Sequence, residues 1–302
     1  MRVFLTGATG FIGGAVAKAL LRAGHEVTAL LRSPHKRGGL EALGARVRQG
    51  DIGVSGTYAA EAARHDVVVH VAMADGADKA IADRVAVDTF LAALHAGAAA
   101  RRFVYTSGCW VLGDTGGLPA AEDASTDGAA ALVRWRPAHE RAVLAGSGAN
   151  ATTVVLRPGL VYGGAGSLTA DWYRGAELHG AVPLVGDGAN HWSFVELADL
   201  GALYVALVES ETTGVVHGVD NAPVRALDAA TAASVAAGAE GRVRHLTLEQ
   251  GRASLAAVAD ALTMDQVMVT ERAAEIGWNP GCGSYLACVE RAYGEWREAT
   301  PR

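Results

Sequence analysis

The sequence has few cysteines and no long hydrophobic run. Cys109, Cys282 and Cys288 form no CxxC motif and no spacing to histidine that is typical of a metal site. We therefore expect neither a disulfide framework nor a metal centre, and free thiols in a reducing compartment. No apolar segment reaches the length of a membrane span, and the first predicted strand follows Met1 and Arg2 at once, so no signal peptide is expected. These absences predict a soluble, cytoplasmic protein without a membrane partner.

The chain also lacks the positive charge of a nucleic-acid-binding protein. Its formal net charge is −6 over 302 residues, which gives no electrostatic footprint for a polyanion. Hydrophobic residues make up 50% of the chain, enough for the core of one large domain or two associated ones. The composition favours a globular protein without a nucleic-acid partner.

The most informative segment is Thr-Gly-Ala-Thr-Gly-Phe-Ile-Gly at residues 6–13. It follows the apolar run Val3-Phe4-Leu5 and opens a helical pattern, so a glycine turn joins a strand to a helix. Gly7 permits the sharp turn, Gly10 lets the backbone approach a pyrophosphate, and Gly13 lets the helix pack closely on the strand. The free N–H groups of the helix then face the anion. This arrangement predicts a dinucleotide site.

The second predicted strand, 26–31, ends without the Asp or Glu that usually holds the ribose 2′-hydroxyl of NAD. Arg32 follows it at once, and Ser33, His35, Lys36 and Arg37 come next. Cationic side chains at this place suit a 2′-phosphate, because charge-assisted pairs to phosphate are strong. A solvated basic loop is the alternative. The pattern favours NADP(H) over NAD(H).

Apolar runs alternate with helical patterns along the first half of the chain. We expect strands at 2–6, 26–31, 46–49, 67–71, 102–107 and 152–157, and helices at about 11–23, 56–64, 79–97 and 134–146. This order predicts an α/β fold: a Rossmann-type doubly wound parallel sheet with a smaller, sequence-discontinuous C-terminal substrate lobe. We place the Rossmann domain at 1–162 plus about 191–218, and the lobe at about 163–190 and 219–302.

Seven segments in this order resemble the extended short-chain dehydrogenase/reductase family, in its NAD-dependent epimerase and dehydratase branch. They are the glycine turn at 6–13, Gly50-Asp51-Ile52, His70-Val71-Ala72, 103–107, the RPxxxYG-like stretch 156–163, the GDG…FVELAD stretch 186–199, and Ile276-Gly277-Trp278-Asn279-Pro280. The resemblance spans nearly the whole chain. It implies cofactor contacts from Thr6, Gly7, Thr9, Gly10, Phe11, Ile12, Gly13, Arg32, Asp51, Ile52, Val71, Ala72, Met73, Thr106, Arg136 and Pro158. It also implies a homodimer, paired through the helices at about 79–97 and 134–146.

The chain departs from the family where the catalytic Tyr and Lys are expected, four residues apart on one helix. The segment 128–141 contains neither residue. By resemblance Leu132 occupies the Tyr position and Arg136 the Lys position, while the usual Ser falls on Gly108, with Ser107 beside it. Arg136 keeps a positive charge but is no proton reservoir, because arginine does not deprotonate in proteins.

Other side chains are candidates for the missing proton donor: Ser107, Tyr105, Tyr162 and His139, with Arg136 beside them. On the substrate side we expect Cys109, Trp110, Trp172, His191 and Trp192. The aromatic rings among them, with few cationic groups to bind a diphosphate, favour a neutral or apolar substrate. The glycine-rich stretch 163–166 would suit a lid. The sequence thus favours an NADP(H)-dependent oxidoreductase or epimerase acting on a small carbonyl or hydroxyl compound with a non-Tyr donor. A degenerate nucleotide sensor or scaffold, and a lyase or isomerase with a structural cofactor, remain as alternatives.

Overall fold

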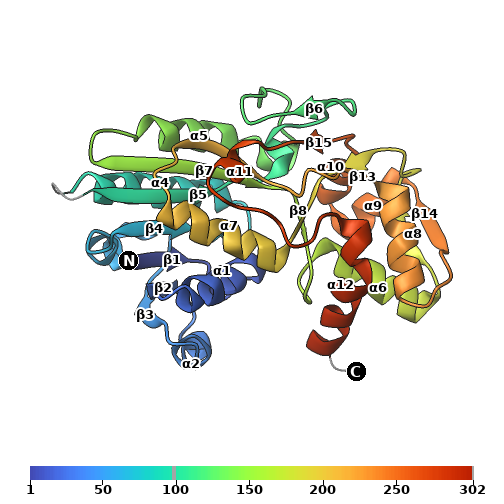
Figure 1. The fold of residues 1–302 in the computed structure, drawn as a ribbon, viewed down its shortest axis with the longest axis horizontal. Helices are drawn as coiled ribbons and strands as arrows, with labels where there is room; N and C mark the ends of the chain where they lie inside the picture. Colours follow the sequence, from blue (N-terminus) through green and yellow to red (C-terminus); the bar gives the residue numbers. More distant parts are fainter. Residues whose placement is uncertain (97–99, 301–302) are drawn as a thin grey trace.

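A seven-stranded parallel sheet forms the larger part of the molecule in this computed structural model, which describes residues 1–96 and 100–300. The strand order is β12-β7-β5-β4-β1-β2-β3, and every neighbouring pair is parallel. The strands are β1 (Arg2–Thr6), β2 (Glu26–Leu31), β3 (Arg46–Gln49), β4 (Val67–His70), β5 (Arg101–Thr106), β7 (Ala151–Pro158) and β12 (Gly214–Gly218). The predicted Rossmann-type sheet is confirmed, with a seventh strand from the second half of the chain (Figure 1).

Helices cover both faces of this sheet because successive strand residues are buried on opposite sides. Val3 and Leu5 belong to one core cluster and Phe4 to another. The first cluster includes side chains of α1 (Phe11–Arg22), α2 (Arg37–Ala42), α7 (Leu197–Glu209) and α11 (Arg272–Glu275). The second includes side chains of α3 (Ala59–Ala62), α4 (Lys79–Leu94) and α5 (Arg136–Ala145).

Two predicted helices differ in extent from the observed ones. The expected helix at 56–64 is broken into a 3₁₀ turn at Ser55–Thr57 and the single turn of α3. The expected helix at 79–97 is α4, which ends at Leu94, and residue 97 lies outside the described residues.

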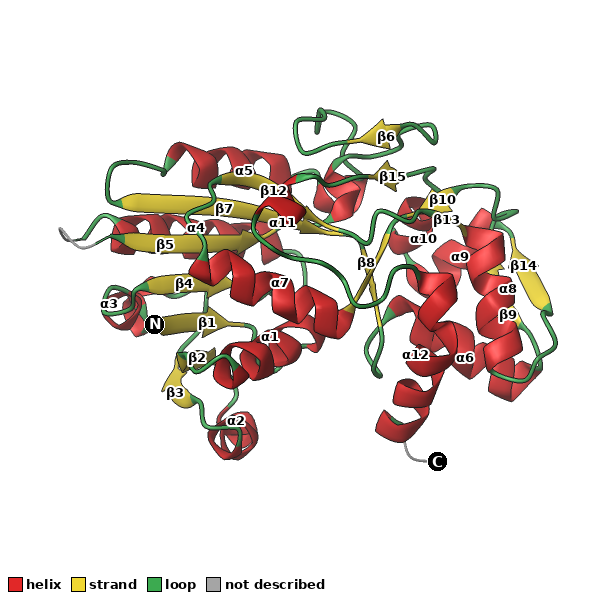
Figure 2. Cartoon of the chain, viewed as in Figure 1, coloured by secondary structure: helices red, strands yellow, loops and turns green. Residues whose placement is uncertain are grey.

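The remaining elements form a lobe beside the carboxyl edge of the sheet (Figure 2). Its helices are α6 (Leu168–His179), α8 (Ala226–Ala236), α9 (Leu248–Leu255), α10 (Val258–Leu262) and α12 (Tyr285–Ala299). Short strands pair within it or link it to the sheet: β9 (Val182–Val185) with β14 (Val243–Leu246), β10 (His191–Trp192) with β13 (Val224–Arg225), β8 (Leu160–Tyr162) with β11 (Phe194–Glu196), and β6 (Pro119–Ala120) with β15 (Val267–Met268). Residues far apart in the sequence therefore build one unit.

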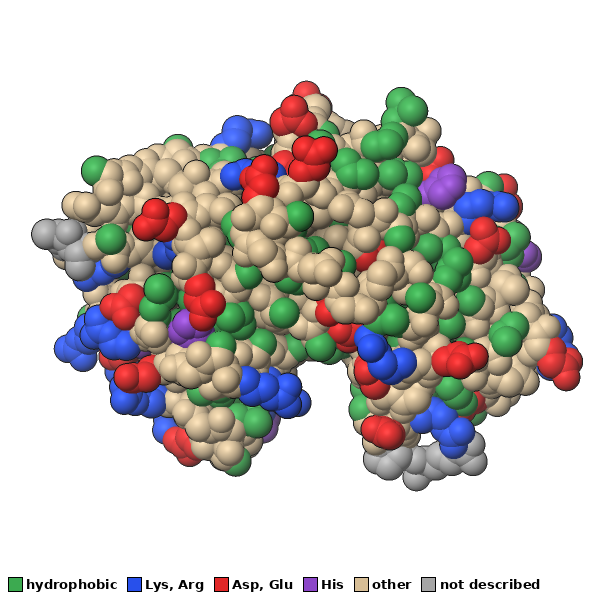
Figure 3. All heavy atoms as spheres, in the orientation of Figure 1, with side chains coloured by type: hydrophobic (Ala, Val, Ile, Leu, Met, Phe, Trp, Pro, Cys, Tyr) green, Lys and Arg blue, Asp and Glu red, His purple; other side chains and the backbone are tan. Residues whose placement is uncertain are grey.

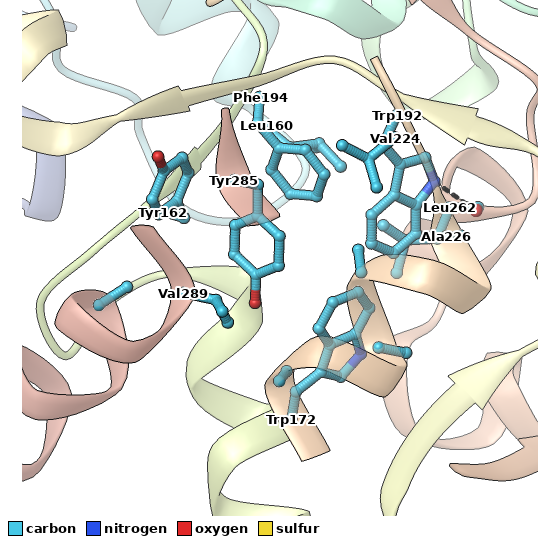
Figure 4. Packing of buried hydrophobic residues seen from close by; sticks show 14 of the residues in the cluster. Leu160, Tyr162, Trp172, Trp192, Phe194, Val224, Ala226, Leu262, Tyr285 and Val289 are labelled. Atoms are coloured by element: carbon cyan, nitrogen blue, oxygen red, sulfur yellow. Dashed lines mark hydrogen bonds between the residues drawn. The ribbon is translucent and has the colours of Figure 1, made fainter. Parts of the chain in front are cut away.

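The core of this lobe is aromatic. Tyr285 of α12 stacks on Phe194 of β11, with ring centroids 4.5 Å apart, and meets the ring of Tyr162 edge-on at 5.0 Å. Trp192 stacks on Trp172 at 5.2 Å and donates its indole N–H to the carbonyl of Leu262, 3.0 Å away (Figure 4). These large rings fix the lobe around α6 and α12.

A disulfide joins Cys282 to Cys288, so the expectation of free thiols at these positions was wrong. Ser284 caps α12 by accepting the N–H of Ala287 with its side chain. The chain thus turns into the helix between the two cysteines, and their Cα atoms lie 6.1 Å apart. Sequence spacing alone does not reveal this reversal.

No helix among the described residues is long and apolar enough to cross a membrane. On the face shown in Figure 3, acidic and basic side chains are interspersed rather than gathered by sign. The same view shows a notch between the Rossmann part and the end of the chain near α12.

Candidate functional site

A cavity of about 380 Å³ lies at the carboxyl ends of β1, β2 and β4. The glycine turn forms one wall. Gly7 has φ +78°, and a Cβ there would stand 2.7 Å from the backbone nitrogen of Ala72. A Cβ on Gly13 would stand 2.0 Å from the carbonyl oxygen of Gly7. Helix α1 begins after Gly10 with no side-chain cap, so its first N–H groups are left for an anion. This backbone fits a pyrophosphate.

Thr6 holds the opposite wall of this cavity in place. Its Oγ1 accepts the backbone N–H groups of Val71 and Ala72, both at 3.2 Å, and lies 2.6 Å from Nδ1 of His70. Val71 and Ala72 follow β4 and line the cavity. The short polar side chain at the end of β1 therefore anchors the backbone that follows β4 beside the cavity.

The far end of the cavity carries both basic and acidic groups. Arg32 and Lys36 line it, as do Asp51 and Ile52. Asp51 accepts the N–H of Gly53 at 2.8 Å. A guanidinium nitrogen of Arg32 lies 3.4 Å from a carboxylate oxygen of Asp75, and both side chains are exposed. The structure thus brings together the residues expected to hold the adenosine half of a dinucleotide.

A second cavity of about 300 Å³ opens on the other side of Met73, which lines both cavities. We refer to this second cavity as the cleft. Most of its lining is carbon. The lining residues are Phe11, Ile12, Met73, Ser107, Gly108, Cys109, Trp110, Leu132, Val133, Arg136, Pro158, Gly159, Leu160, Val161, Gly166, Ser167 and Leu168. A dinucleotide whose pyrophosphate lies at the glycine turn would therefore reach the cleft with its nicotinamide half.

Leu132 and Arg136 both line the cleft, Leu132 from the 3₁₀ turn Ala131–Val133 and Arg136 as the first residue of α5. Arg136 is 8% exposed. Its Nη1 donates to the carbonyl of Thr106 at 2.8 Å, and its guanidinium carbon lies 4.7 Å from the centre of the Trp135 ring. A fixed positive charge thus stands at the inner wall of an apolar cleft.

Ser107 and Cys109 add a hydroxyl and a thiol to the cleft just after the end of β5. Within the described part of the chain, the Ser107 hydroxyl is buried and has no hydrogen-bond partner. Burial raises the pKa of the Cys109 thiol to about 12, so it stays protonated at neutral pH. The serine is therefore free to donate to a bound molecule.

The other expected proton donors do not face the cleft. His139 is buried, with Nδ1 2.7 Å from Oδ2 of Asp83 and its ring on Trp135. Tyr162 lies in the aromatic core of the lobe, where burial and then the nearby carboxylate of Asp220 raise its pKa. The hydroxyl of Tyr105 donates to Asp83 at 2.9 Å and is fully buried.

The expected substrate residues divide between two places. Cys109 and Trp110 line the cleft. Trp172 and Trp192 instead line a cavity of about 350 Å³ inside the lobe, which shares Leu168 with the cleft. His191 does not line the cleft, and its Nδ1 lies 2.9 Å from a carboxylate oxygen of Asp265.

Sequence reasoning missed Asp83, which connects several of these residues. It is 1% exposed and lies on α4 among the buried positions Ala86, Val87 and Phe90. Burial alone would raise the pKa of Asp83, but the imidazole side chains of His139 and His70 beside it outweigh burial and hold the pKa well below its usual range. The sequence does contain a sign of Asp83, because it is a carboxylate at a helical position whose neighbours on the same face are apolar.

Comparisons with known proteins agree with this geometry. The family model described as "NAD dependent epimerase/dehydratase family" matches residues 3–221. The chain belongs to this family. A 3-diazoavenalumate denitrifying reductase from Streptomyces sp is 34% identical over 75% of this chain and 78% of its own. A 2-alkyl-3-oxoalkanoate reductase from Stenotrophomonas maltophilia is 30% identical over 63% of this chain and 60% of its own.

Solved structures show the same fold over the whole chain. The crystal structure of the human epimerase family protein SDR39U1 with NADPH has a TM-score of 0.79 and 19% identity, covering 97% of this chain and 99% of that one. The dTDP-glucose 4,6-dehydratase from Bacillus anthracis with NAD has a TM-score of 0.80 and 15% identity, covering 99% and 100%. This member of the epimerase/dehydratase family is therefore an NAD(P)-dependent oxidoreductase or epimerase that binds a nicotinamide dinucleotide.

Proposed function

We propose that this protein is an NADP(H)-dependent reductase of a small, largely apolar carbonyl compound, which binds in the cleft. The observation that carries the proposal is the cleft itself: a carbon-lined space at the end of the dinucleotide cavity, with Ser107 and Arg136 as its polar groups suited to a substrate oxygen. Two relatives support this class, since both are named as reductases and neither name refers to a nucleotide sugar.

The residues of the cleft bind and polarise the substrate. When bound, the nicotinamide supplies the hydride. The hydroxyl of Ser107 donates to the substrate oxygen and passes on its proton, and solvent restores this proton once the product has left the cleft. Arg136 stabilises the negative charge that develops on this oxygen, because a preorganised cation is most effective where water is excluded. Arg136 itself keeps its protons throughout.

The preference for NADP(H) rests on Arg32 and Lys36 at the far end of the dinucleotide cavity. A 2′-phosphate there would compete with Asp75 for the guanidinium of Arg32, and the long, exposed contact of 3.4 Å between them is easily replaced. Arg32→Ala is expected to weaken NADPH binding by about tenfold or more and to leave NADH binding unchanged. Arg37→Ala is the matched control, because Arg37 pairs with Glu41 and does not line the cavity.

The first experiment is a titration of the protein with NADPH and NADH, followed by energy transfer from tryptophan to nicotinamide. Tight NADPH binding, weaker NADH binding and oxidation of NADPH by a panel of aromatic and aliphatic ketones would support the proposal. Binding without oxidation of cofactor by any of them would favour the sensor or the lyase with a structural cofactor. Failure to bind either nucleotide would refute the proposal.

Two further expectations complete this proposal. We infer a homodimer paired through α4 and α5, which light scattering on the purified protein would test. We also infer a cytoplasmic location, where disulfides are rare. A reducing cytoplasm would open the disulfide that joins Cys282 to Cys288 in the structure.

A further inference from the structure

The buried carboxylate of Asp83 lies at the centre of a polar network beneath both cavities. Its Oδ2 accepts from the hydroxyl of Tyr105 at 2.9 Å and lies 2.7 Å from Nδ1 of His139. Its Oδ1 lies 3.3 Å from Nε2 of His70, a contact that does not form a hydrogen bond. These partners come from β5, α5 and β4, so one side chain on α4 joins four elements.

One branch of the network reaches the dinucleotide cavity. Because Thr6 Oγ1 already accepts two backbone N–H groups, its own proton points to Nδ1 of His70, 2.6 Å away. His70 therefore carries its proton on Nε2, directed toward Asp83. The Thr6 hydroxyl thus fixes the tautomer of His70, whose Nε2 side lies against the carboxylate of Asp83.

The other branch reaches the cleft. The phenol oxygen of Tyr105, which donates to Asp83, lies 3.4 Å from Nη1 of Arg136. Arg136 is held further by the carbonyl of Thr106 and by the ring of Trp135. The phenol of Tyr105 therefore links the carboxylate of Asp83 to the guanidinium of Arg136 in the cleft.

The network is unsuited to carrying a proton to the substrate. Arg136 is the member that faces the cleft, and arginine does not release a proton. Tyr105 is fully buried, and burial raises its pKa well above the ordinary value. The effect of Asp83 on the cleft is therefore electrostatic and geometric.

We propose that Asp83 is a positioning residue that holds Arg136 at the nicotinamide end of the cleft and balances its charge there, and thereby sets the relative affinity for oxidised and reduced cofactor. An oxidised nicotinamide ring carries a positive charge and a reduced ring does not. Without Asp83, the charge of Arg136 repels the oxidised ring alone. This inference rests on the proposed binding of NADP(H).

The test compares the dissociation constants of NADP⁺ and NADPH in wild type and in Asp83→Asn. The variant is nearly isosteric and removes the charge. We expect the ratio of the NADP⁺ constant to the NADPH constant to rise about tenfold, which raises the potential of the bound couple by about 30 mV. Asp88→Asn is the matched control, because Asp88 lies on the same helix and pairs with Arg84 at the surface. Its ratio is expected to equal that of wild type.

Two more variants show whether Asp83 acts through Arg136. In an Arg136→Met background, Asp83→Asn is expected to leave the ratio unchanged, since no cation remains to be balanced. Tyr105→Phe removes the bridging hydroxyl and keeps the ring, so it should raise the ratio by a smaller factor. It also carries the test if Asp83→Asn does not fold.

A merely structural role would weaken the binding of both forms equally and leave the ratio unchanged, and this result would overturn the inference. A tenfold rise that persists without Arg136 would overturn it as well, because Asp83 would then act directly on the cofactor. If the wild-type protein binds neither form, the proposed function fails instead. The two failures are thus distinguishable.

Discussion

The two adjacent glycines at the start of α1 provide a sharp test of the glycine turn. A Cβ on Gly13 would stand 2.0 Å from the oxygen and 2.5 Å from the carbon of the Gly7 carbonyl. A Cβ on Gly14 would stand 3.6 Å from the carbonyl oxygen of Ala8, an ordinary contact. Gly13→Ala and Gly14→Ala therefore make the same chemical change one residue apart in one helix, with opposite steric outcomes.

The size of each effect follows from two terms. Replacing an interior helical glycine by alanine stabilises a helix by about 1 kcal/mol. At Gly13 the atoms in collision are backbone, so α1 must move by about 1 Å away from the turn, and overpacking of this kind costs about 3 kcal/mol or more. We expect Gly14→Ala to stabilise the protein by about 1 kcal/mol and Gly13→Ala to destabilise it by about 2 kcal/mol or more.

Thermal unfolding and NADPH titration measure both consequences. At roughly 2 °C per kcal/mol for a chain of this size, the melting temperatures of the two variants should differ by about 6 °C. Gly13→Ala should also weaken NADPH binding at least about tenfold, since moving α1 displaces the N–H groups that face the pyrophosphate. Equal stability and equal NADPH affinity in the two variants would refute the close approach of α1 to the turn.

Three other predictions concern buried groups. Burial raises the pKa of Asp220 to about 7 in the folded protein, whereas its pKa in the unfolded chain is near 4. The protonated carboxyl therefore contributes its full stability below about pH 4, and this contribution is lost as the pH rises to about 7. Urea unfolding between pH 5 and 7 should show wild type losing up to about 1.4 kcal/mol per pH unit relative to Asp220→Asn, and parallel curves would contradict the shift. The buried hydroxyl of Tyr162 has no partner among the described residues, so Tyr162→Phe should keep wild-type stability and wild-type NADPH oxidation. Ser107→Ala, by contrast, should slow NADPH oxidation at least about tenfold. Slower oxidation in Tyr162→Phe and wild-type oxidation in Ser107→Ala would show that Ser107 takes no part in the reaction. Replacing Cys282 and Cys288 by serine should lower the free energy of unfolding by about 2 kcal/mol in the absence of reductant. A thiol titration of the unfolded, unreduced wild type should find one free thiol, and three would contradict the disulfide.

The sequence predicted the sheet and the dinucleotide cavity because their determinants are local. The glycine turn, the apolar runs and the missing carboxylate after 26–31 are each read within a few residues. The structure then places Arg32, Asp51 and Met73 around one cavity, since strand ends of a parallel sheet meet at one edge.

What the sequence did not reveal depends on contacts between distant segments. Asp83 and His139 lie 56 positions apart and meet only because α4 and α5 pack side by side. Trp172 and Trp192 are residue types typical of a substrate site, but Trp172 on α6 and Trp192 on β10 stack on each other in the interior of the lobe. Local patterns cannot distinguish an aromatic side chain that lines a cleft from one that packs in a core.

The edge strand β12 can join the sheet only after part of the lobe has been synthesised. Six strands of the sheet are complete once Pro158 has been made, but β12 follows only after α6 and β9, which belong to the lobe. Trp172 and Tyr173 of α6 stay uncovered until α12, more than a hundred residues downstream, has been synthesised and packs against them. At 5–20 residues per second, their apolar surface stays open on the ribosome for roughly 5–20 s. The nascent Rossmann part thus carries an uncovered aromatic helix during this interval, and exposed apolar surface of this kind favours aggregation.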